Sequence, residues 1–160
     1  MKFTSVLAAV ACTITASAQS TGAFTNFIDC GGKGVQLFLE DFSVAPSPMC
    51  IGKDICINAT GELADDILPG STMDVYGKHL GQVVYSDKID LCQALAANGQ
   101  ACPVPYNTRS FKICFKLKST YMPGSATQFD FNASNGDRMT LFCQRGMSQR
   151  FIVKLREEDS

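Results

Sequence analysis

The chain has 160 residues, of which 46% are hydrophobic and 18% are charged, and its formal net charge at pH 7 is −1. This balance is typical of a globular protein and leaves no basic surface for nucleic acid, so no nucleic-acid partner is expected. The length suits one domain with a hydrophobic core.

The N-terminus has the three regions of a secretory signal peptide in the expected order. Lys2 supplies a positive charge, residues 6–11 form an apolar segment, and residues 16–18 are the small residues of a cleavage site. We therefore predict a signal peptide over residues 1–18 and a single mature domain over residues 19–160. No later segment approaches the ~20 apolar residues that a membrane-spanning helix needs. The predicted localisation is secreted, or the lumen of a vacuole or lysosome reached through the secretory pathway.

After the predicted cleavage site, short segments of alternating apolar and polar residues are separated by Gly, Pro, Asn and Asp. Alternation of this kind predicts antiparallel strands, and only residues 92–97 predict a helix, of one or two turns. In chain order, we expect strands over residues 35–40, 55–60, 72–75, 82–86, 111–118, 128–132 and 139–143, with a further strand or extension over residues 151–155. The predicted fold class is all-β, an immunoglobulin-like β-sandwich of about seven antiparallel strands in two sheets.

The cysteines predict a disulfide-stabilised domain. Removal of the signal peptide takes Cys12 and leaves an odd number, which predicts three disulfides and one unpaired thiol. The seven that remain are Cys30, Cys50, Cys56, Cys92, Cys102, Cys114 and Cys143. Cys92 and Cys102 bound a short loop, and closing it would stabilise the fold by about 2.5–3 kcal/mol through loss of unfolded-chain entropy.

The sequence gives little sign of an enzyme. His79 is the only histidine, and no Ser or Cys nucleophile accompanies it in a recognisable motif. The chain has no CxxC motif and no His cluster, so a metal site is not expected either. We expect no catalysis and no cofactor. N-glycosylation is predicted at Asn58 and Asn132, which begin acceptor triplets on the polar faces of their strands.

Several short motifs, in their order along the chain, resemble a known family. They are Asp29-Cys30-Gly31, Ser47-Pro48 before Gly52-Lys53, Ala59-Thr60-Gly61-Glu62-Leu63, Ile67-Leu68-Pro69-Gly70, Asp74-Val75, Asp90-Leu91-Cys92, Cys102-Pro103, Met122-Pro123-Gly124 and Leu141-Phe142-Cys143. Together they resemble the secreted ML lipid-recognition domain family. Within it, the phosphatidylglycerol/phosphatidylinositol transfer proteins look most similar, and the soluble Niemann-Pick type C cholesterol-transfer protein looks like a more distant relative.

The resemblance implies the pairing of two disulfides, Cys30–Cys143 and Cys92–Cys102. The partner of Cys56 stays open, because family members with a third bridge favour Cys50–Cys56, whereas the parity of the two strands also permits Cys56–Cys114. We take Cys50–Cys56 as the expected pair.

The resemblance also implies a lipid held between the two sheets. Alternation alone predicts a solid core, but the resemblance implies an apolar cavity lined by the inward-facing side chains. The predicted lining is Ile57, Val75, Val83, Tyr85, Phe111, Phe115, Phe129 and Phe131. Residues 68–70 and 121–124 are the predicted membrane-contacting loops.

The expected function is transfer of one lipid between membranes by a monomer with transient membrane contact. A phospholipid such as phosphatidylglycerol or phosphatidylinositol is the first expected ligand, and a sterol is the second. The alternative is an extracellular recognition module of the same family that binds a protein or receptor, with or without a presented lipid.

Overall fold

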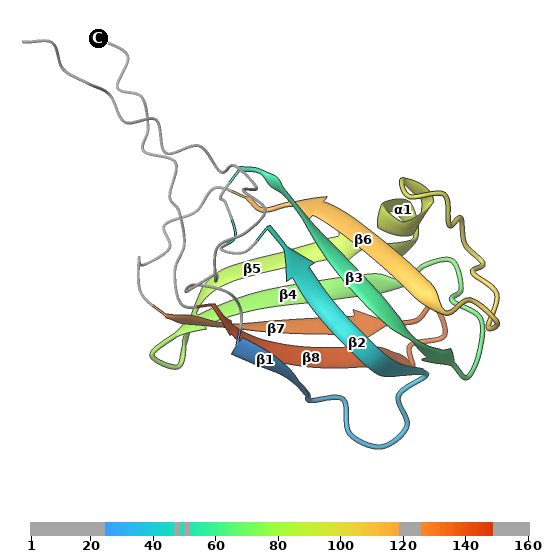
Figure 1. Ribbon diagram of the computed structural model, residues 1–160, viewed down its shortest axis with the longest axis horizontal. Coiled ribbons are helices and arrows are strands. Elements are labelled where there is room, and N and C mark those ends of the chain that lie inside the picture. The colour runs from blue at the N-terminus through green and yellow to red at the C-terminus, as the bar shows by residue number, and fades with distance from the viewer. Residues whose placement is uncertain (1–24, 47–48, 50–51, 119–125, 149–160) are drawn as a thin grey trace, which may run out of the picture.

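Two antiparallel sheets lie face to face in the computed structural model, which describes residues 25–46, 49, 52–118 and 126–148 (Figure 1). The larger sheet has five strands in the order β1-β8-β7-β4-β5, and the smaller has three in the order β2-β3-β6. In chain order the elements are β1 (Thr25–Asp29), β2 (Leu37–Ala45), β3 (Asp54–Leu63), β4 (Thr72–His79), β5 (Gln82–Asp90), α1 (Leu91–Ala96), β6 (Ser110–Lys116), β7 (Thr127–Ser134) and β8 (Thr140–Ser148). The all-β, two-sheet prediction is confirmed.

The described residues contain eight strands, whereas seven were predicted over this part of the chain. The additional strand is β1, which was not predicted from the sequence. This edge strand has only five residues, and its pairing with β8 is irregular between Thr25 and Ile28, so it lacks a clear alternating pattern. The predicted signal peptide and the predicted strand over residues 151–155 lie outside the described residues.

The predicted helix is present as α1. It begins after the N-cap Asp90, whose carboxylate accepts a hydrogen bond from the backbone N–H of Gln93 at 2.9 Å. It buries Leu91, Ala94 and Leu95. No helix in the part of the chain that the structure describes is both long and apolar enough to cross a membrane.

Three disulfides are present among the described residues: Cys30–Cys143, Cys56–Cys114 and Cys92–Cys102. The expected Cys50–Cys56 pair is wrong, because Cys56 is bonded to Cys114. The register of the small sheet explains this bond, since Cys56 on β3 lies directly opposite Cys114 on β6 and their side chains share one face. Cys50 lies outside the described residues.

A buried asparagine ties together the loops at one end of the sandwich. The Asn135 Oδ1 atom accepts hydrogen bonds from Leu68 N at 2.7 Å and from Ser71 Oγ at 2.9 Å. Its Nδ2 atom donates to Gln36 Oε1 at 2.7 Å and to the Asp66 carbonyl at 2.9 Å. The β7–β8 turn therefore anchors both the approach to β2 and the loop before β4.

Candidate functional site

The inward faces of both sheets carry the residues predicted to contact a lipid. Seven of the eight predicted lining residues are buried: Ile57 on β3, Phe111 and Phe115 on β6, Val75 on β4, Tyr85 on β5, and Phe129 and Phe131 on β7. They belong to one continuous hydrophobic cluster that draws on both sheets. The alternation of each strand places these side chains correctly because antiparallel strands with one solvated face keep period 2.

Val83 is the exception and is a correction to the predicted lining. A bulge between β4 and β5 pairs Tyr85 with Gly77 but Val83 with Lys78, so Val84 has no residue opposite it. The extra residue reverses the parity of the strand. Val83 therefore lies on the outer face beside Lys78, and 56% of it is exposed.

Gly77 makes room for two of the inward rings. A Cβ atom at this position would lie 3.0 Å from Tyr85 Cβ and 3.2 Å from Phe129 Cε1. The rings of Tyr85 and Phe129 pack over the glycine with their centroids 6.2 Å apart. A larger residue here would displace one ring, so Gly77 helps to set the shape of the interior.

A polar cluster interrupts the apolar interior at one edge of the sandwich. Asp87 shares the inward parity of Tyr85 on the edge strand β5, and it pairs with the fully buried Val75. Its carboxylate forms an ion pair with Lys118, which follows β6, and Tyr85 Oη lies 3.5 Å from Asp87 Oδ2. The backbone N–H of Lys118 donates to Tyr85 Oη at 3.3 Å.

Burial raises the pKa of Tyr85 to about 12, although the hydrogen bond from the Lys118 backbone lowers it, and the nearby Asp87 charge raises it further. The phenol is therefore neutral near pH 7 and available as a hydrogen-bond donor. Sequence analysis missed Asp87 and Lys118. The signal for Asp87 was its position two residues after Tyr85, which puts a carboxylate on the inward face of the strand.

The outer face of the five-stranded sheet carries a second charged cluster. Asp130 accepts hydrogen bonds from Arg145 Nε at 2.7 Å and from Lys78 Nζ at 3.0 Å. Burial by itself raises the pKa of Asp130, but the hydrogen bonds from Arg145 and Lys78 outweigh burial and hold the pKa below its usual value. Two cations on one carboxylate leave an excess positive charge within this cluster.

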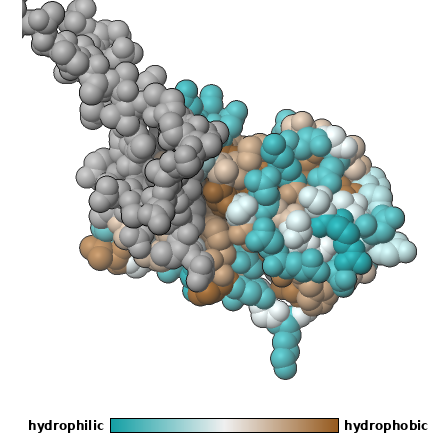
Figure 2. Space-filling view, viewed as in Figure 1, coloured by the Kyte–Doolittle hydropathy of each residue, from teal (hydrophilic) through white to brown (hydrophobic). Residues whose placement is uncertain are grey.

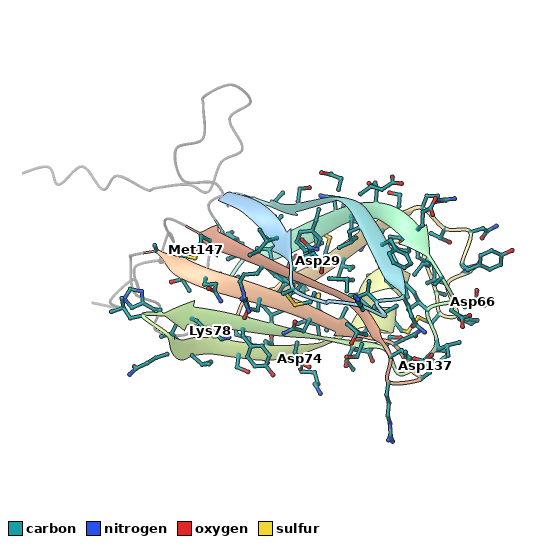
Figure 3. The ribbon with its side chains drawn as sticks, turned by 90° about the horizontal axis from the view of Figure 1, so that it is seen from below. Asp29, Asp66, Asp74, Lys78, Asp137 and Met147 are labelled. Carbon is teal, nitrogen blue, oxygen red and sulfur yellow. A yellow bond between two sulfur atoms is a disulfide. The ribbon has the colours of Figure 1, made fainter. Side chains whose placement is uncertain are left out.

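An exposed leucine lies at the same end of the molecule as Lys78. Leu80 and Gly81 form the two-residue turn between β4 and β5, with φ values of 50° and 78°. Leu80 is 90% exposed, and Figure 2 shows hydrophobic surface at the tip of this hairpin. Figure 3 shows Lys78 and Met147 at this end of the sandwich, with Asp66 and Asp137 at the opposite end.

The predicted membrane-contacting loops are less apolar at their surface than this hairpin, or lie outside the described residues. Leu68 is half-buried, and its backbone N–H donates to Asn135, whereas Pro69 and Gly70 are exposed, so contact of residues 68–70 with a membrane stays a prediction. Residues 121–124 lie outside the described residues. Sequence analysis did not single out Leu80, because a lone leucine before a glycine carries no membrane signal.

The remaining predicted sites lie away from the interior. Asn58 is exposed on the outer face of the small sheet, and Asn132 is half-buried on the outer face of the large sheet. The His79 ring lies at the base of the hairpin, with Nδ1 3.0 Å from the carbonyl oxygen of Ala126. Within the described ranges, no three His, Cys, Asp or Glu side chains are grouped as metal ligands.

Residues 25–147, which run from β1 to β8, match the family model of the ML domain. The chain belongs to the ML domain family. Its fold is similar to that of a Niemann-Pick type C2 protein from Japanese carpenter ant, with a TM-score of 0.60, 16% identity, and coverage of 81% of this chain and 100% of that one.

A second solved structure is similar in fold. Chicken MD-1 in complex with lipid IVa matches with a TM-score of 0.57 and 18% identity, covering 79% of this chain and 88% of that one. Among curated proteins, none matches this ML domain in sequence.

Proposed function

We propose that this ML domain binds one lipid between its two sheets and transfers it between membranes. The observation that carries the proposal is the pair of apolar inward faces, whose strands form ladders only within their own sheet. An acyl chain or sterol inserted between the sheets would replace side-chain contacts and would break no ladder hydrogen bond. The complex of chicken MD-1 with lipid IVa supports the same use of the fold.

The physical benefit of such a site is the removal of apolar lipid surface from water. Each exposed CH₂ group costs about 0.8 kcal/mol in water, so a free lipid crosses the aqueous phase slowly. A phospholipid such as phosphatidylglycerol or phosphatidylinositol is the first proposed ligand, supported by the sequence resemblance, and a sterol is the second.

Transfer also requires transient contact with a membrane, and the β4–β5 hairpin supports such contact. Leu80 at its tip offers an apolar side chain to the bilayer interface. Lys78 and Arg145 share a single carboxylate, so one uncompensated positive charge lies close to the hairpin. This combination of an apolar tip with positive charge suits an anionic membrane surface.

The setting proposed for this activity is the secretory pathway and the compartments it supplies. The three described disulfides support an oxidising environment. The protein is proposed to act there as a monomer, without covalent chemistry, and to carry glycans at Asn58 and Asn132.

Native mass spectrometry of the purified protein, followed by organic extraction and lipid identification, tests the proposal. One co-purifying lipid per chain, or lipid taken up from mixed vesicles, is the expected result. The mass in the same spectrum also gives the oligomeric state and the mass of any attached glycan. A mass that stays ligand-free after incubation with vesicles would reject lipid transfer and favour a module that recognises protein.

A further inference from the structure

The two open edges of the sandwich are closed by different kinds of contact. Between β1 and β2, the rings of Phe27 and Phe42 pack with their centroids 4.7 Å apart, and Phe42 also packs against Phe142. At the β5–β6 edge, α1 packs against both strands, and Asp87 and Tyr85 on β5 make polar contacts with Lys118 just beyond β6. The second edge is therefore the one where a polar group can meet the apolar interior.

Asp87 is costly to bury and has unused hydrogen-bonding capacity. Its side chain is 4% exposed, and a buried carboxylate is unfavourable unless it is paired. The Oδ1 atom accepts from the Lys88 backbone at 2.9 Å and from Lys118. The nearest described donor to Oδ2 is Tyr85 Oη at 3.5 Å, which is at the limit of a hydrogen bond. This oxygen has room for a stronger donor.

Lys118 complements the carboxylate from the solvent side. Its side chain is 68% exposed, although its ammonium group contacts the buried Asp87. The ammonium therefore lies where the interior meets water and has donors left for a second anion. The cluster thus combines an acceptor inside the edge with a cation outside it.

We propose that Asp87, Tyr85 and Lys118 bind the polar end of the lipid, and that this end carries a hydroxyl group next to a phosphodiester. The hydroxyl donates to Asp87 Oδ2 and accepts from the Tyr85 phenol, while the phosphodiester pairs with the Lys118 ammonium. The inference rests on the proposed function, since it assigns the polar end of the lipid whose apolar part lies between the sheets.

This chemistry discriminates among lipids. Phosphatidylglycerol offers both hydroxyl and phosphodiester, whereas phosphatidylcholine has a quaternary ammonium that donates no N–H hydrogen bond. A sterol offers a hydroxyl but no phosphate, so it leaves Lys118 without a new partner. Polyol phospholipids are therefore the class that the cluster fits in full.

The test measures transfer of acyl-labelled phosphatidylglycerol and phosphatidylcholine from donor to acceptor vesicles, with a fluorescent sterol as a third substrate. We expect the wild-type protein to transfer phosphatidylglycerol about tenfold faster than phosphatidylcholine, as one hydrogen bond to a charged group would provide. Asp87→Asn should lower this ratio severalfold, and Tyr85→Phe, which removes only a hydroxyl, should lower it less. Lys118→Gln should instead slow the transfer of both phospholipids severalfold and leave sterol transfer unchanged, because both phospholipids carry the phosphodiester that Lys118 binds.

Matched controls keep the change in net charge the same. Asp74→Asn removes an outer-face carboxylate paired with Lys88 at 3.7 Å, and Lys116→Gln removes an exposed lysine on β6. Both controls should keep the wild-type ratio and the wild-type transfer rates. Thermal unfolding of each variant shows whether it remains folded.

Failure of this inference differs from failure of the proposed function. Wild-type protein that moves both phospholipids at equal rates, or a folded Asp87→Asn variant that keeps the ratio, would overturn the head-group site while leaving lipid transfer intact. A folded Lys118→Gln variant that transfers both phospholipids at the wild-type rate would overturn it too. Uptake of sterol alone would also overturn it, because Lys118 would have no phosphate to bind. If wild-type protein takes up no lipid of any class, the proposed function itself fails.

Discussion

Leu80 occupies a position where stability and membrane contact favour different residues. Its φ of 50° lies in the left-handed region, and it is followed by Gly81 in a two-residue hairpin turn. Such turns favour Asn-Gly, because asparagine adopts positive φ at a lower cost in strain than leucine does. The Leu80→Asn substitution should therefore relieve about 1 kcal/mol of backbone strain and raise Tm by about 3 °C.

The same substitution should weaken association with anionic vesicles. Leu80 is 90% exposed in the free protein, so its burial in the bilayer interface would contribute about 2 kcal/mol. Loss of that contribution corresponds to about 30-fold weaker partitioning. Vesicle co-sedimentation measures the partitioning, and calorimetry measures Tm.

A second exposed apolar residue provides the control for this experiment. Phe38 lies on β2, in the other sheet, and is more than half exposed. Phe38→Thr removes apolar surface but keeps strand propensity, so it should leave vesicle association unchanged. If Leu80→Asn left vesicle binding at the wild-type level, or if Phe38→Thr weakened it equally, the hairpin would not be the membrane-contacting element.

Three further variants test the fold. Replacing both Cys56 and Cys114 with serine should lower the free energy of unfolding by about 4 kcal/mol, from the 58-residue separation that the disulfide closes, as measured by urea denaturation. Asn135→Ala removes the partner of several buried donors and acceptors and should cost about 3 kcal/mol in the same assay. The pKa of Asp130 is lowered in the folded protein, so the ionised carboxylate stabilises the fold. This stabilisation is present above the unfolded pKa near 4 and is lost as the pH falls through the lower folded pKa. Asp130→Asn should therefore flatten the decline of Tm between about pH 5 and about pH 2, and an unchanged decline would contradict the assigned ion pairs.

The sequence predicted the fold and most of the interior because both depend on a local signal. Alternation in β3, β6 and β7 directly identifies which side chains point inward, as at Ile57, Phe111 and Phe129. Val83 was misplaced because one bulged residue in β5 changes the parity, and a bulge has no clear sequence mark here.

Features that depend on long-range register could not be settled from the sequence. Strand parity permitted the Cys56–Cys114 bond, but only the alignment of β3 with β6 shows that these residues lie directly opposite one another. Asp87 was missed for a similar reason. Its inward parity was visible, but its partner Lys118 is 31 residues away and joins it only when the two sheet edges meet.

The arrangement of the disulfides bears on how a lipid could enter. Cys30–Cys143 links the end of β1 to β8 beside the large sheet, and Cys56–Cys114 lies within the small sheet. Cys92–Cys102 links α1 to the loop that follows it. None of these described disulfides joins a strand of one sheet to a strand of the other. The cross-links therefore stabilise the folded chain without fixing the distance between the sheets. Separation at the β5–β6 edge would exchange the polar contacts of Lys118, and the packing of α1 against both strands, for contacts with lipid and water.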